Sequence, residues 1–139
     1  MNHFGLESEN FRLSLDFNVF ESDIAYPCNT TLTVSVYSDG FSATTDMDID
    51  VKEIGGFCGD LKTIYDSFRG EAKISESYGK QSILFSCDRH GHVFVSGLLC
   101  SGGANGFWHE LKFENILDQS FLPPLIRDLT AFSKKYSGV

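Results

Sequence analysis

Hydrophobic and polar residues alternate along much of this chain, and alternation with a period of two is typical of β-strands that bury one face. The predicted strands span residues 11–19, 31–38, 41–49, 71–77, 82–88, 92–99 and 107–116. Asp39-Gly40 predicts a tight hairpin between the second and third strands, because Asp and Gly tolerate the positive φ angles of such a turn. Residues 88–91 predict a second hairpin.

Apolar residues in two other segments recur at spacings of three and four, which is the period of an amphipathic α-helix. The first stripe is Ile54, Phe57, Cys58, Leu61, Ile64, Tyr65 and Phe68, and the second is Leu122, Leu125, Ile126, Leu129 and Phe132. Asp50 and Glu53 fit a capping box before the first helix, and Gly70 fits a left-handed cap after it. Pro123 and Pro124 fit the first turn of the second helix.

These elements predict an α+β fold in a single domain that spans residues 1–139. The expected architecture has two layers, namely an antiparallel sheet of about six or seven strands and two helices packed on one face of it. The sequence shows no internal repeat. A chain of 139 residues with 42% hydrophobic residues is large enough to bury a core without covalent cross-links.

The composition predicts a cytoplasmic protein. The first residues, MNHFGLESENF, lack both the basic and the apolar region of a signal peptide. No apolar run approaches the ~20 residues that a membrane-spanning helix needs. Because thiols stay reduced in the cytoplasm, Cys28, Cys58, Cys87 and Cys100 are expected to be free and packed as small hydrophobic residues.

Negative charge is concentrated in the first part of the chain. Residues 1–60 hold eleven Asp and Glu against two basic residues, whereas residues 61–139 hold eight acids against nine bases. In the strand 41–49 the face opposite the hydrophobic residues carries an acidic row. We therefore predict that four residues bind a partner with a basic surface, with the first two central: Asp46, Asp48, Asp50 and Glu53. The alternative is a solvated face that only protects the hairpin from edge pairing.

Residue types that bind zinc occur together in the second half of the chain. Four of them are Cys87, His90, His92 and Cys100. Zinc accepts two thiolates and two imidazoles, but this C-x2-H-x-H-x7-C spacing is not that of a common zinc module. We therefore predict no metal and no cofactor, and expect reduced cysteines with solvent-facing imidazoles instead.

Catalysis by a nucleophile would need a Ser or Cys beside a His that a carboxylate orients. The available pairs are His109 with Asp118 and His90 with Asp88, and no recognised nucleophile motif accompanies them. The chain is therefore predicted not to be an enzyme. Two alternatives stay open: a small metal-dependent or hydrolytic enzyme in which these histidines converge in a pocket, and a ligand-binding module with an apolar cavity between sheet and helices.

Short motifs between residues 31 and 132 resemble those of a family of small uncharacterised bacterial proteins. The matching motifs are Asp39-Gly40-Phe41-Ser42, Arg69-Gly70-Glu71-Ala72, Gly91-His92-Val93 and Leu122-Pro123-Pro124-Leu125. That family is similar to the WapI-type immunity proteins, which neutralise toxins delivered between competing bacteria. The resemblance implies an antitoxin that binds a cognate toxin domain. It identifies no partner residues, because the motifs are turn and core signals and are more specific for fold than for mechanism.

Charge and resemblance together predict a non-enzymatic immunity protein whose acidic first half covers the basic surface of a toxin domain. A nuclease is the kind of toxin we expect, because carboxylates can replace the phosphates that such an enzyme holds. Nucleic acid is not an expected partner, since the net charge of −8 opposes contacts with phosphate. A membrane is not expected either, and the sequence does not determine the oligomeric state.

Overall fold

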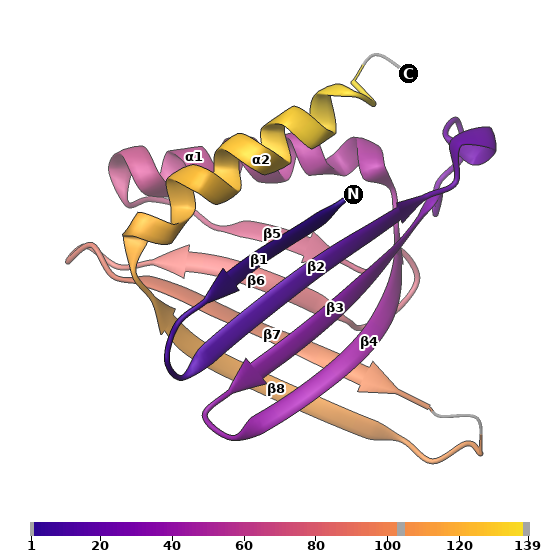
Figure 1. Cartoon of the computed structure of the whole chain (residues 1–139), viewed down its shortest axis with the longest axis horizontal. Helices are drawn as coiled ribbons and strands as arrows, with labels where there is room; N and C mark the ends of the chain where they lie inside the picture. The colour runs from indigo at the N-terminus through magenta and orange to yellow at the C-terminus, as the bar shows by residue number, and fades with distance from the viewer. Residues whose placement is uncertain (1, 103–104, 138–139) are drawn as a thin grey trace.

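The computed structural model describes residues 2–102 and 105–137. Over these residues the chain forms two four-stranded antiparallel sheets and two α-helices (Figure 1). Sheet A contains β1 (His3–Glu7), β2 (Phe11–Val19), β3 (Thr30–Ser38) and β4 (Phe41–Ile49), in that order. Sheet B contains β5 (Ala72–Ser75), β6 (Ser82–Cys87), β7 (Val93–Ser101) and β8 (His109–Leu117), in that order. The helices are α1 (Ile54–Ser67) and α2 (Leu122–Lys134).

The α+β class is confirmed, but the prediction of one sheet with six or seven strands is wrong. Alternation shows which face of a strand is buried and does not show which strands are neighbours. The chain leaves sheet A after β4, forms α1 and then begins a new sheet, so that β4 and β8 are both edge strands. The prediction also missed β1, because HFGLE is short and contains Gly5, which lowers strand propensity.

The two halves of the chain repeat one topology, although the sequence shows no repeat. Each half is a four-stranded meander followed by a short 3-10 turn and an α-helix. The turns are η2 (Val51–Glu53) and η3 (Gln119–Phe121). A constant offset of 68 residues relates β4 to β8 (41 to 109, 49 to 117) and α1 to α2 (54 to 122). The repeat lies in the positions of the elements and their caps, and a comparison of residue identities does not detect it.

Each helix packs on the sheet of the other half. Helix α1 contacts β5 and β6, α2 contacts β1, and the two helices contact each other. The sheets contact each other through β3, β4, β7 and β8, and the helix pair covers the side where the sheets diverge (Figure 1). Inward side chains from both sheets and both helices form one hydrophobic cluster.

Aromatic rings fill the space between α2 and sheet A. The ring centroid of Phe132 in α2 lies 4.9 Å from that of Phe17 and 5.5 Å from that of Phe4. Phe132 also packs edge-on against Tyr136 at the end of the chain, with centroids 5.5 Å apart. This is the region where a ligand-binding module would need an apolar cavity, and here packed rings occupy it.

The turn and cap predictions are partly confirmed. Asp39 and Gly40 have φ angles of 48° and 93°, as a tight hairpin requires, and α2 has its prolines in the first turn. The predicted capping box is wrong: Asp50 accepts a hydrogen bond from the N–H of Lys52 in the 3-10 turn, and Glu53 makes no side-chain cap. The left-handed residue that ends α1 is Phe68, with φ of 51°, and Gly70 has positive φ two residues later.

Among the described residues, neither helix combines the length and the hydropathy that a bilayer span requires.

Candidate partner-binding surface

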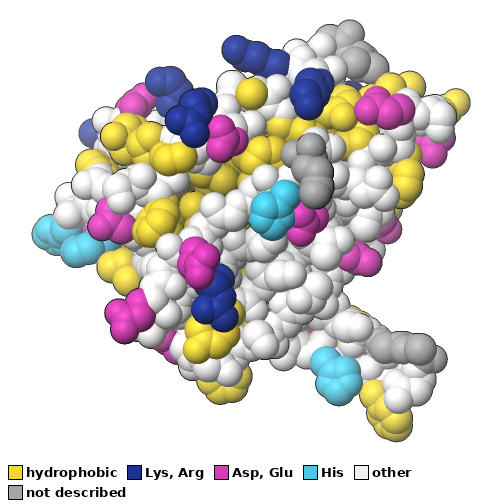
Figure 2. Space-filling model, viewed as in Figure 1, with side chains coloured by type: hydrophobic (Ala, Val, Ile, Leu, Met, Phe, Trp, Pro, Cys, Tyr) yellow, Lys and Arg dark blue, Asp and Glu magenta, His cyan; other side chains and the backbone are white. Residues whose placement is uncertain are grey.

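The outward face of sheet A is rich in small polar residues. Its side chains on β2, β3 and β4 are Arg12, Ser14, Asp16, Asn18, Thr31, Thr33, Ser35, Tyr37, Ser42, Thr44, Asp46 and Asp48. Figure 2 looks onto this side of the molecule: white polar side chains and backbone occupy most of it, and hydrophobic side chains gather along the helices. We call this surface the polar face.

Asp46 and Asp48 lie on the polar face and are both exposed, as the sequence predicted. Two residues along one strand face are ~7 Å apart, so a single extended partner surface can contact both carboxylates. The hydroxyl of Thr33 on the neighbouring strand donates to Oδ1 of Asp46 at 2.6 Å. This bond orients the Asp46 carboxylate and leaves its second oxygen for a partner.

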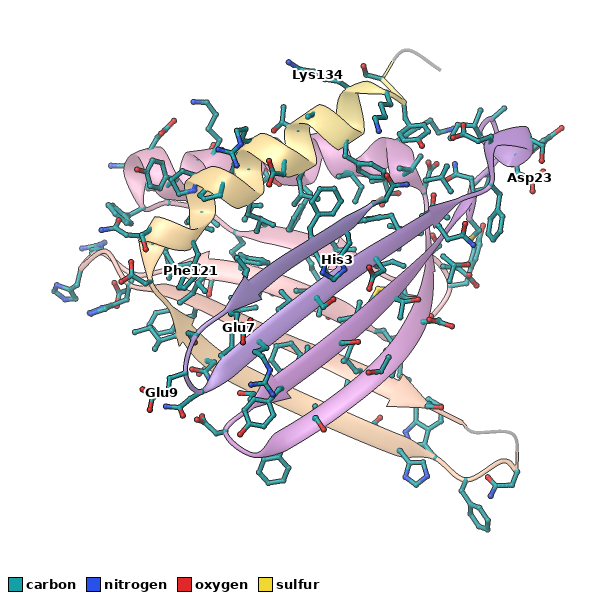
Figure 3. All side chains as sticks on the ribbon, in the orientation of Figure 1. His3, Glu7, Glu9, Asp23, Phe121 and Lys134 are labelled. Carbon is teal, nitrogen blue, oxygen red and sulfur yellow. The ribbon has the colours of Figure 1, made fainter. Side chains whose placement is uncertain are left out.

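The basic groups of the polar face already have partners within the protein. Nδ1 of His3, labelled in Figure 3, lies 2.5 Å from Oδ1 of Asp16. The guanidinium carbon of Arg12 lies 4.1 Å from the ring centroid of Tyr37, in a cation–π contact. No described Lys, Arg or His forms an ion pair with Asp46 or Asp48. These two carboxylates are therefore the charges on this face that are free to attract a cationic partner.

The other two predicted partner residues lie beyond the end of β4. Oδ1 of Asp50 accepts hydrogen bonds from the N–H of Lys52 and from Nδ2 of Asn29, both at 2.9 Å. Nζ of Lys52 lies 3.7 Å from the other oxygen of Asp50. Asp50 is half-buried and holds the start of the helical segment, whereas Glu53 is exposed on η2. The structure therefore brings Asp46 and Asp48 together and gives Asp50 a capping role.

A groove that the sequence reasoning missed runs along the seam between the two sheets. We call it the seam groove. It consists of three adjoining hollows of about 360, 420 and 460 Å3. The first part of β4 forms one wall, and residues of β7 and β8, including Leu99 and Leu111, form the other. The groove reaches Asp46 at one end and Glu114 at the other.

The buried amide of Gln81 joins the two sheets at one end of the seam groove. Its Nε2 donates to the carbonyl oxygen of Asp46 on β4 at 2.8 Å. Its Oε1 accepts from the hydroxyl of Thr45 at 2.6 Å and from the N–H of Cys100 on β7 at 3.2 Å. Gln81 is 4% exposed and thus fixes β4 against sheet B.

A second amide joins the sheets at the other end. Nδ2 of Asn115 on β8 donates to the hydroxyl of Ser38 at 2.9 Å and to a carboxylate oxygen of Asp39 at 3.2 Å. The hairpin signal in the sequence gives the register of β4. It does not show that β4 is an edge strand beside β8, because that depends on the division into two sheets.

The candidate zinc ligands do not converge. Cys87 pairs with Val93 at the start of β7, and Cys100 lies seven residues further along the same strand. At ~3.3 Å per residue this separation is about 23 Å, which one zinc ion with bonds of ~2.3 Å cannot bridge. No group of three or more potential ligands occurs among the described residues.

The two candidate His–Asp pairs also differ from the predicted arrangement. His109 and Asp118 lie at opposite ends of β8, and Asp118 accepts from the N–H of Ser120 at 2.9 Å. Asp88 accepts from the N–H groups of His90 and His92 and lies 2.8 Å from the His92 ring, so it organises a turn. Desolvation acts to raise the pKa of Asp88, but these hydrogen bonds outweigh it, and the pKa lies below its ordinary value.

The cysteines are free thiols, as predicted, but only Cys58 is buried, and Cys28, Cys87 and Cys100 are partly exposed. Cys58 is buried in the stripe of α1, and burial raises the pKa of its thiol above the ordinary value. Burial also raises the pKa of Cys87 and Cys100. A thiol with a raised pKa is a poor nucleophile at neutral pH.

The polar face, with the exposed carboxylates of Asp46 and Asp48, adjoins the seam groove. A model of the WapI-like immunity protein family matches residues 3–137. The chain therefore belongs to the WapI-like immunity protein family, as the resemblance of its motifs predicted, and the family indicates an immunity role. No curated protein matches the chain.

Proposed function

We propose that this protein binds the cognate toxin domain of a bacterial toxin and occludes its working surface. Membership of the WapI-like immunity protein family is the observation that carries the proposal. The protein acts by binding in the cytoplasm, without catalysis and without a cofactor. His109 and Asp118 lie at opposite ends of β8, Asp88 organises a turn with His90 and His92, and the cysteine–histidine set does not converge. No specific observation therefore favours an enzyme instead.

The polar face is the surface that contacts the toxin, with Asp46 and Asp48 at its centre. Both carboxylates are exposed and have no basic partner among the described residues, so a cationic surface is their natural complement. Glu53 adds charge beyond the end of β4, and Asp50 contributes from its capping position. A nuclease fits this chemistry, because its substrate-binding surface attracts phosphates and therefore also attracts carboxylates.

Charge at this surface acts mainly on the rate of association. Complementary charges steer two proteins toward each other before contact and raise the association rate 10- to 1000-fold at low salt in favourable cases. Because the net charge is −8 and the negative charge is concentrated in residues 1–60, the electrostatic potential around this part of the protein is negative. Occlusion then follows from the size of the interface and not from the carboxylates alone.

Co-expression with the toxin tests this function. The probe is a candidate toxin domain chosen from the products of the genes next to this chain's gene, expressed from an inducible promoter. We expect the wild-type chain to restore growth and to form a stable complex with that domain. The double variant Asp46→Lys/Asp48→Lys should protect poorly at the same expression level.

A matched control has the same change in net charge at another place. Asp60 on α1 and Glu71 before β5 are exposed and lie outside sheet A. The variant Asp60→Lys/Glu71→Lys should protect as well as wild type. Wild-type protein that neither binds the toxin domain nor restores growth would contradict the proposed function.

A further inference from the structure

We infer that the seam groove receives an extended segment of the toxin, which adds as a further strand to the open edge of β4. This inference rests on the proposed function and names the mode of contact. It depends on three features of the structure: the direction of the backbone groups of β4, the open part of its edge, and the charge around the groove.

The hairpin at Asp39-Gly40 fixes the direction of the backbone groups of β4. In a two-residue hairpin the residues that flank the turn form a hydrogen-bonded pair, and such pairs alternate with non-hydrogen-bonded ones. Ser38 pairs with Phe41, so Ser42, Thr44 and the following even-numbered residues of β4 turn their N–H and C=O groups away from β3.

Hydrogen bonds at the far end of the strand agree with this direction. The carbonyl of Asp46 accepts from Gln81, and the carbonyl of Asp48 accepts from the N–H of Ser77 at 2.9 Å. The turn between β5 and β6 thus covers this part of the β4 edge.

The first part of the β4 edge is open. Within residues 2–102 and 105–137, no hydrogen bond engages the N–H or C=O of Ser42 or Thr44 on the side of the groove. The sequence FSATT also lacks the Pro, Lys or inward charge with which proteins protect an edge strand. Two donors and two acceptors, with a spacing of ~7 Å between alternate residues, therefore face the groove in the arrangement that an extended backbone complements.

The side chains around this edge select an amphipathic strand. A strand added beside β4 turns alternate side chains inward, toward Ala43, Leu99 and Leu111, which line the groove. Its other side chains lie on the polar face beside Asp46. Carboxylates outnumber amines among the described residues that line the groove: Asp39, Asp46, Glu110 and Glu114 against Lys112. The segment that fits has apolar residues alternating with Lys or Arg.

Charge also argues against a second copy of this chain as the occupant. Over the described residues the sheets have four edge strands, of which β1 and β5 are packed against α2 and α1. The two that border the seam groove, β4 and β8, carry Asp46 and Asp48 or Glu110 and Glu114. Placing either beside the acidic groove brings like charges together, which destabilises strand pairs. A basic segment of the toxin has no such conflict.

Thr44→Pro tests strand addition because it removes one groove-facing N–H and fills the edge with a ring. The ladder to β3 does not use this N–H, and edge strands tolerate proline where the N–H faces outward. Thr44→Val is the control, since it also removes the hydroxyl but keeps the backbone donor. With the same toxin domain as above, we expect Thr44→Pro to weaken binding by at least ~100-fold and Thr44→Val by less than ~3-fold.

Amide hydrogen exchange tests strand addition in the wild-type protein, so its result does not depend on whether a variant folds. We expect the amides of Ser42 and Thr44 to exchange rapidly in the free protein and slowly in the complex. Wild-type binding with unchanged exchange at both amides, or full binding by a folded Thr44→Pro variant, would overturn strand addition and leave the proposed function intact. A dimer of the free protein that Thr44→Pro abolishes would assign the edge to a second copy. No binding by wild type would overturn both proposals.

Discussion

The two halves of the molecule build the same element order with different surfaces. At the offset of 68 residues, Ile49 corresponds to Leu117, and both are buried; Asp50 corresponds to Asp118, and each caps a 3-10 turn. Outward on the same pair of strands, Asp48 corresponds to Ile116, which is 54% exposed. The fold thus requires the core and the caps, and it leaves the outward positions of the strands unconstrained.

The outward face of sheet B shows which residue types the fold accepts at outward strand positions. Its strands present Leu84, Phe94, Leu98 and Ile116 beside the charged residues Glu110, Lys112 and Glu114 of β8. Because Asp48 corresponds to Ile116, folding does not explain the acid at position 48, whereas Asp46 corresponds to Glu114, an exposed acid on β8. Folding does explain Asp50, since its counterpart Asp118 has the same role in the other half.

Truncating a core side chain in either helix should lower the free energy of unfolding at least as much as any other substitution considered below. Phe132 in α2 corresponds to Ile64 in α1, and both are almost fully buried. Phe132→Ala should lower the free energy of unfolding by about 4 kcal/mol, and Ile64→Ala by about 3 kcal/mol, because the aromatic contacts of Phe132 add to the lost burial. Urea unfolding monitored by circular dichroism measures both. A loss below ~1 kcal/mol in either variant would contradict a shared core.

The caps of the two halves differ in one contact. In the first half the buried side chain of Asn29 donates a hydrogen bond to the Asp50 carboxylate that caps the turn. Asn29 is 0% exposed; its Nδ2 donates to Asp50, and its Oδ1 accepts from the N–H of Val51 at 2.9 Å. Asn29→Ala leaves that buried N–H without an acceptor and should lower the free energy of unfolding by about 3 kcal/mol. The same urea titration checks this value, and a loss equal to that of an exposed Asn18→Ala control would refute it.

The caps should differ in strength. Asp50→Ala removes a cap that also binds Asn29, and we expect a loss of about 1–2 kcal/mol in the free energy of unfolding. Asp118 is exposed and binds only within its own turn, so Asp118→Ala should have the smaller effect. Thermal unfolding of the two variants side by side measures the difference. An equal or larger effect of Asp118→Ala would mean that Asn29 adds nothing to the cap.

The cap at Asp118 should also have a pH dependence of its own. Hydrogen bonds from the backbone and the side chain of Ser120 lower the pKa of Asp118 in the folded protein. In the unfolded chain the pKa of an Asp side chain is about 3.9. Because the pKa of Asp118 is lower than this in the folded protein, its ionised carboxylate stabilises the fold fully above that pH. This stabilisation is lost as the pH falls through the folded-state pKa. Asp118→Asn keeps a neutral cap acceptor, so wild type should lose melting temperature relative to it below about pH 4. A difference that is constant from pH 7 to pH 2 would contradict this assignment.

Much of the fold follows from local sequence patterns, and the rest depends on long-range pairing. Alternation at residues 11–19 and the stripe from Ile54 to Ile64 predict elements that the structure contains. The division into two sheets was not predictable, because it is decided by which strands pair and not by which face each strand buries. The exposure of Asp46 and Asp48 on one strand face was predictable because alternation shows which face of a strand is outward. The open edge at Ser42 and Thr44 was missed because an edge exists only once neighbours are known.

Association kinetics with the toxin domain test most directly whether the polar face binds it. Stopped-flow mixing compares wild type, Asp46→Lys/Asp48→Lys and Asp60→Lys/Glu71→Lys over a range of salt concentrations. The last two have the same net charge, so only the position of the change differs. We expect the first variant to associate at least ~10-fold more slowly than wild type at low salt, with a flatter salt dependence, and the second to stay within ~3-fold. Equal rates for wild type and Asp46→Lys/Asp48→Lys, or equal slowing of both variants, would contradict a binding site on the polar face.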